Sequence, residues 1–114
     1  MQDHEMRGLL GDAYDTTTPE QRAQIDQAAT RIAERWPDPD LADTRQAALT
    51  GAMMLVLGDD TLEAVAGRVR AARYAYEDAL AEMTGALLVS PGTEVELVQR
   101  TGLARMTVRK ALGK

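Results

Sequence analysis

The side chains with the clearest chemistry in this chain lie between residues 101 and 110. Arginine, lysine and threonine can all donate hydrogen bonds to anions, and an arginine guanidinium can donate two in parallel. The candidate binding residues are Thr101, Arg105, Met106, Thr107, Arg109 and Lys110. Residues 92–114 contain five basic and two acidic residues, a net charge of +3, whereas residues 1–91 carry −8. A basic end on an acidic chain favours binding to a polyanion.

Two short helices around a tight turn would position these side chains. Thr93 can cap the first helix, and Glu96, three residues later, completes the capping-box pattern. Gly102 stands where the chain must turn, because glycine adopts positive φ without steric cost. Val108 and Leu112, four residues apart, give the second helix a buried stripe.

The stretch 93–112 resembles the DNA-binding helix-turn-helix of small bacterial and phage regulators. In that motif a glycine opens the turn, and a Gly-Leu-(Ser/Thr)-Arg-x-Thr-Val run begins the recognition helix. The resemblance covers roughly the last fifth of the chain. It departs at Ala104, where such motifs usually carry Ser or Thr. The second helix therefore lacks a side-chain N-cap, worth about 1 kcal/mol.

The resemblance implies a sequence-specific DNA-binding protein, with residues 104–112 as the recognition helix in the major groove. Arg105 and Arg109 would make bidentate contacts with guanine, and Met106 would lie against a thymine methyl group. One such helix gives a small interface, so we expect a homodimeric transcription regulator that reads an inverted repeat in double-stranded DNA. Phosphate contacts are expected from Thr101, Thr107 and Lys110.

Three alternatives remain open at this point. The terminal helices could be a packed αα-hairpin whose charges are merely solvated. The chain could be an acidic helical adaptor that binds a protein partner or mimics DNA toward one. It could also be a phage or plasmid DNA-binding accessory factor, because excision, partition and packaging proteins use the same motif. The sequence does not distinguish a repressor from an activator.

Helix start and stop signals divide the rest of the chain. Residues 1–14 have near-helical apolar spacing weakened by two glycines, which predicts a short or fraying helix. Thr18, Pro19 and Gln21 form a start signal for a helix that runs to about Trp36, where Pro37 stops it.

The next two helices are also marked by caps. Asp38 and Pro39 are expected to begin one helix, and Asp60 to cap another. The run 52–57 is apolar on all sides, so it must be buried on several sides or meet another chain.

The helix that follows Asp60 has apolar residues at alternating steps of three and four over about three heptads. We expect this seam, or failing it the run 52–57, to mediate self-association. Arg73 and Glu77 are four residues apart and can pair. The candidate oligomerisation residues are Leu62, Val65, Val69, Tyr76 and Met83.

The predicted fold class is all-α: a helical bundle with a long helix that leads into a C-terminal helix-turn-helix. Only two residues follow Leu112, so no wing is expected. We expect an N-terminal segment (1–17), an acidic helical body for oligomerisation or partner binding (18–75), and a trihelical DNA-binding unit (76–114) that shares the long helix.

Catalysis is not expected. The chain has no cysteine and a single histidine, His4, so it lacks a thiolate metal site and a nucleophile–histidine set. Asp38, Asp40 and Asp43 do not follow the spacing of a calcium loop. We therefore expect no enzyme, cofactor or metal. No apolar run is long enough for a membrane span, and we see no leader sequence, so a cytoplasmic location is expected.

Overall fold

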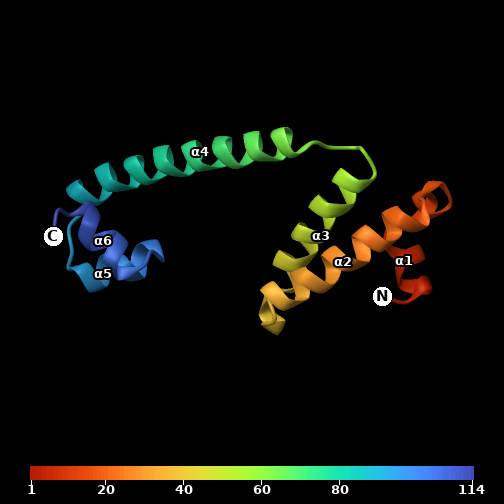
Figure 1. Ribbon diagram of the computed structural model, residues 1–114. Coiled ribbons are helices and arrows are strands. Elements are labelled where there is room, and N and C mark those ends of the chain that lie inside the picture. The colour runs from red at the N-terminus through yellow and green to blue at the C-terminus, as the bar shows by residue number, and fades with distance from the viewer. The chain divides into compact units, whose positions relative to one another are not determined.

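The computed structural model describes all 114 residues, and every regular element in it is a helix, which confirms the all-α prediction (Figure 1). There are six α-helices and two short 3-10 helices, and the chain contains no strand. None of the helices has the length and apolar character needed to cross a membrane. The elements are α1 (Asp3–Leu10), η1 (Gly11–Thr16), α2 (Pro19–Arg35), η2 (Pro39–Leu41), α3 (Ala42–Val56), α4 (Leu62–Val89), α5 (Glu94–Thr101) and α6 (Arg105–Ala111).

Two compact units make up the chain, which we call unit 1 (residues 1–66) and unit 2 (residues 67–114). Unit 1 contains thirteen acidic and five basic residues, and unit 2 contains five acidic and eight basic residues. Their formal net charges are therefore −8 and +3. The boundary lies within α4.

Unit 1 is built on the antiparallel pair α2 and α3 (Figure 1). The predicted capping box is present: the Thr18 hydroxyl accepts a hydrogen bond from Gln21 N–H at 3.1 Å, and the Gln21 side chain accepts from Thr18 N–H at 2.8 Å. The helix ends at Arg35, as Pro37 predicts. The Arg45 guanidinium then joins α3 to this end through a 2.7 Å hydrogen bond to the Trp36 carbonyl.

The core of unit 1 forms around Ile25, which is fully buried. Met6 and Leu10 of α1 pack against it, so the N-terminal helix docks on α2. The apolar run 52–57 contributes one side to the same cluster, while Met54 and Leu55 on its other side are 37% and 40% exposed.

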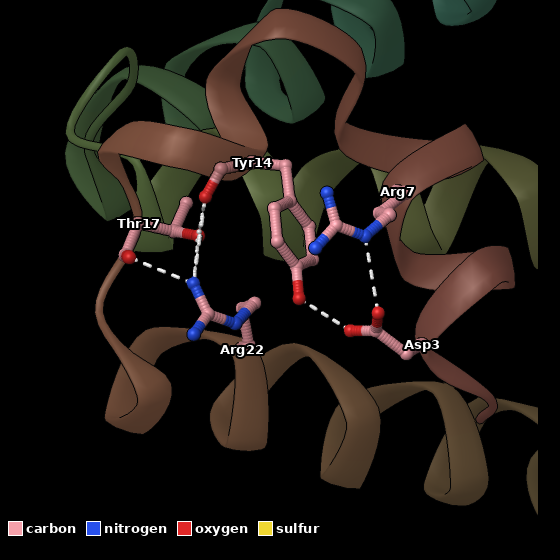
Figure 2. A network of polar contacts seen from close by, with 5 residues as sticks. All are labelled: Asp3, Arg7, Tyr14, Thr17 and Arg22. Carbon is pink, nitrogen blue, oxygen red and sulfur yellow. Dashed lines mark hydrogen bonds and ion pairs between the residues drawn. The ribbon is translucent and has the colours of Figure 1, made fainter.

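A polar network fastens α1 to α2 outside this core (Figure 2). The Tyr14 ring lies between the guanidinium groups of Arg7 and Arg22, at 4.1 and 4.6 Å from the ring centroid. The Tyr14 hydroxyl donates a short hydrogen bond to Asp3, and Arg7 donates another at 3.0 Å. Arg22 also donates to the Thr17 carbonyl at 2.8 Å. The two hydrogen bonds that Asp3 accepts hold its pKa below its usual value, and the bond from Tyr14 has a larger effect than the bond from Arg7.

Unit 2 consists of α4 from Gly67 onward with α5 and α6. Its core is a cluster of three buried side chains, one from each helix: Leu87, Leu97 and Val108. Met83 of α4 and Leu112 pack against this cluster. The two short helices are thereby held against the C-terminal part of α4.

Four local expectations need correction. The side chain that caps α4 is Thr61, which accepts a hydrogen bond from Ala64 N–H at 3.1 Å. Asp38 and Pro39 begin the 3-10 helix η2, and α3 starts only at Ala42, because Asp38 accepts from Asp40 N–H in a tighter turn. Thr93 caps α5, but the reciprocal bond from Glu96 is absent. Arg73 and Glu77 form no ion pair within the chain.

Candidate functional site

The turn between α5 and α6 fixes the position of every candidate binding residue. Gly102 adopts the left-handed conformation with φ 69° and ψ 9°, which a residue without Cβ does at no steric cost. Its N–H donates to the Val98 carbonyl at 2.9 Å and closes α5. The Thr101 hydroxyl donates to the Leu97 carbonyl at 2.8 Å and accepts from Leu103 N–H at 3.2 Å. Thr101 therefore organises the turn.

The orientation of α6 follows from one buried residue. Val108 is fully buried, and Ala111 and Leu112 are partly buried beside it. At 100° per residue, the opposite side of the helix is centred on Met106, which is 67% exposed. Ala104 precedes the helix in an extended conformation and its side chain makes no cap, as the sequence predicts.

The remaining candidate residues flank Met106 on its two sides. Arg105 and Arg109 lie one turn apart on the side that faces the start of α5. Thr107 and Lys110 lie on the other side, along a groove between α4 and α6. The structure thus brings five of the six predicted residues together on one helix, with Thr107 and Arg109 partly buried, and it places the sixth, Thr101, in the turn.

A single carboxylate gathers the cations on the first side. Glu94, at the first position of α5, has a side chain that is only 16% exposed. One of its oxygens lies 3.5 Å from Arg105 Nε and 3.4 Å from Arg109 Nη1, and the other lies 3.6 Å from Lys114 Nζ. The positive end of the helix dipole also favours a carboxylate at this position. Three cations around one anion leave this cluster with a formal charge of +2.

Glu94 is the residue that inspection of the sequence missed. Its only sequence signal is an acidic residue at the first helical position in an otherwise basic segment. The arginine and lysine side chains of the cluster are 40–66% exposed, so they remain open to a ligand while Glu94 holds them. Such an arrangement suits an extended anion that meets several cations at once.

No other group of polar side chains in the chain is held together by as many ion pairs as the cluster around Glu94. No cluster of three or more histidine, aspartate or glutamate side chains is placed to hold a metal ion. Comparison of the chain with protein-family models, with curated proteins and with solved structures finds no match in any of the three. The likeness of residues 93–112 to helix-turn-helix regulators therefore stays a prediction.

Proposed function

We propose that unit 2 binds duplex DNA and that α6 is its recognition helix. The observation that carries this proposal is the exposed side of α6, where Met106 lies between Arg105 and Arg109 on one side and Lys110 on the other. A helix of this kind enters the major groove with its side chains against base edges. The buried Val108 keeps the helix in the required orientation.

Each exposed side chain has a distinct role in this proposal. Arg105 and Arg109 make bidentate hydrogen bonds with guanine, each worth about 1–3 kcal/mol of discrimination. Met106 contacts a thymine methyl group. Thr107 and Lys110 contact phosphates and fix the register. The hydroxyl of Thr101 already donates one hydrogen bond and accepts another within the turn. Its remaining lone pair can only accept, so Thr101 contacts a phosphate through a bridging water.

The distribution of charge supports the same function. Unit 2 carries +3 and unit 1 carries −8, so a polyanion attracts the end of the chain that bears α6 and repels the other. We propose a homodimeric transcription regulator of the cytoplasm, which reads an inverted repeat with half-sites about one helical turn apart. An accessory factor of a phage or plasmid would use the same surface.

The test is a selection of the purified protein against random duplex DNA at near-physiological salt. The variant Arg105→Ala/Arg109→Ala removes the base-reading pair, and the matched control Arg31→Ala/Arg35→Ala removes two positive charges from α2. We expect wild type and control to enrich an inverted repeat, and the α6 variant to lose at least tenfold in affinity for it. Equal losses in both variants would mean non-specific attraction, and no binding by wild type would contradict the proposal.

A second candidate function concerns unit 1. Its net charge of −8 and the exposed pair Met54 and Leu55 favour a basic protein partner with an apolar contact. In that case Met54→Ser/Leu55→Ser abolishes partner binding, while Arg105→Ala/Arg109→Ala leaves it intact. The same two variants therefore separate an adaptor from a DNA-binding regulator.

A further inference from the structure

An apolar stripe runs along α4 and is covered along only part of its length. Leu62 and Val69 in the first half are 67% and 55% exposed. Tyr76 and Leu80 continue the stripe, since steps of seven and four keep side chains on one side of a helix. In the second half this side faces a groove between α4 and α6 within unit 2. The groove is lined by Tyr76, Leu80, Thr84, Thr107, Lys110 and Ala111.

We propose that a second copy of this chain packs against the α4 side of that groove, formed by Tyr76, Leu80 and Thr84, and leaves Thr107 and Lys110 on the α6 side open to DNA. The first half of α4 in each copy lies antiparallel along the second half of α4 in the other, so two equivalent contacts form. With the twofold axis near residue 75, Val69 lies opposite the partner's Leu80. This inference rests on the dimer that the proposed function requires, but it is tested without DNA.

The twofold axis sets which residues meet. With the axis near residue 75, the groove residues Tyr76 to Thr84 face residues 66–74 of the partner, and each segment extends about 12 Å at 1.5 Å per residue. Tyr76 is 63% exposed in the single chain and Leu80 is half-buried, so both gain burial when Val69 of the partner enters. Because the contact has twofold symmetry, the same side chains are buried twice in each dimer.

Charge selects the antiparallel orientation. On the side of the stripe, Arg73 belongs to the first half of α4 and Glu77 to the second, and neither forms an ion pair within its own chain. Antiparallel pairing places Arg73 beside the partner's Glu77 and over the partner's Tyr76, twice by symmetry. Parallel pairing places each of these charges beside its own copy, and it aligns the two helix dipoles unfavourably.

Introduced cysteines report the orientation directly, because the chain has none of its own. A disulfide requires Cα atoms within about 7 Å. We expect Val69→Cys and Leu80→Cys chains to cross-link when mixed and oxidised, and neither to cross-link alone. Glu82→Cys, on the opposite side of α4, is the control and stays monomeric on a denaturing gel. Self-cross-linking of Val69→Cys, or no cross-link in the mixture, would overturn the proposal.

A charge exchange at exposed positions tests the same interface without altering buried side chains. Sedimentation equilibrium should show that Arg73→Glu and Glu77→Arg each weaken the dimer about tenfold, since each change turns two attractive contacts into repulsive ones. A mixture of the two variants should restore the wild-type Kd, and the control Glu82→Arg should leave it within about twofold. A monomeric wild type at high concentration, or no rescue in the mixture, would refute antiparallel pairing. DNA binding by a monomer would leave α6 standing as the proposed DNA-binding surface, and it would refute both the proposed dimer and this inference.

Discussion

Replacing Glu94 by glutamine should change stability and DNA affinity in opposite directions. The substitution keeps the size of the side chain and removes the charge that lies 3.4–3.6 Å from three cations. Exposed ion pairs contribute about 0.2–1 kcal/mol each, and the cations here are 40–66% exposed. Three such pairs, with the interaction of the carboxylate and the α5 dipole, give a loss of about 1–2 kcal/mol in the free energy of unfolding of unit 2.

The same change should strengthen DNA binding. Glu94 repels a phosphate that approaches Arg105 or Arg109, and at about 7 Å in water this repulsion is about 0.6 kcal/mol. Its removal raises the affinity about threefold. The cluster then carries +3 in place of +2, so the slope of log K against log[salt] should steepen by up to about 0.9.

Urea unfolding followed by circular dichroism measures the first effect, and anisotropy of a labelled duplex at several salt concentrations measures the second. Glu96→Gln is the matched control, since Glu96 lies in the same turn of α5 and makes no ion pair with α6. Weaker DNA binding by a folded Glu94→Gln protein would refute the reasoning, because it would mean that Glu94 orients the arginines for contact and does not compete with phosphate. No change in either measurement would refute the ion cluster itself.

Two further predictions concern local stability. Ala104→Ser supplies the missing cap of α6 and should raise the unfolding free energy of unit 2 by about 0.5–1 kcal/mol in urea titration, with Ala104→Val giving no comparable gain. The pKa of Asp3 in the folded chain lies below its usual value of 3.8. Ionised Asp3 therefore contributes to the free energy of unfolding above that pH, and the contribution disappears as pH falls through the lower pKa of the folded state. Asp3→Asn should therefore lower Tm at neutral pH and converge with wild type in acid, which thermal unfolding at several pH values measures.

Local sequence signals predicted those features that depend on a few neighbouring residues. The Thr18–Gln21 capping box, the stop at Pro37 and the turn at Gly102 were all predictable, because each follows from the chemistry of one short segment. The all-helical class followed from them. The cap of α4 was misjudged by one residue, since Asp60 and Thr61 are both good capping residues and only the backbone geometry decides between them.

Features that depend on how helices cross were not predictable in this way. The ion cluster needs Glu94 and Arg105 on different helices, and their separation in sequence does not indicate contact. Met83 illustrates the same limit, because its heptad position suits self-association while the structure packs it against the core of unit 2. Heptad spacing identifies a buried side of a helix and does not say which neighbour covers it.

The middle of α4 is exposed to solvent in the single chain, and this exposure lowers the local stability of the helix. All twelve residues from 68 to 79 are exposed, so this stretch is held mainly by its own backbone hydrogen bonds. Its amide protons should exchange with solvent faster than those of the core residues Leu87 and Val108. While this stretch is folded, α4 is one continuous helix. When the stretch opens briefly, the two ends of α4 can move independently. Association along α4 would slow those openings, so amide exchange at residues 68–79 would then depend on protein concentration.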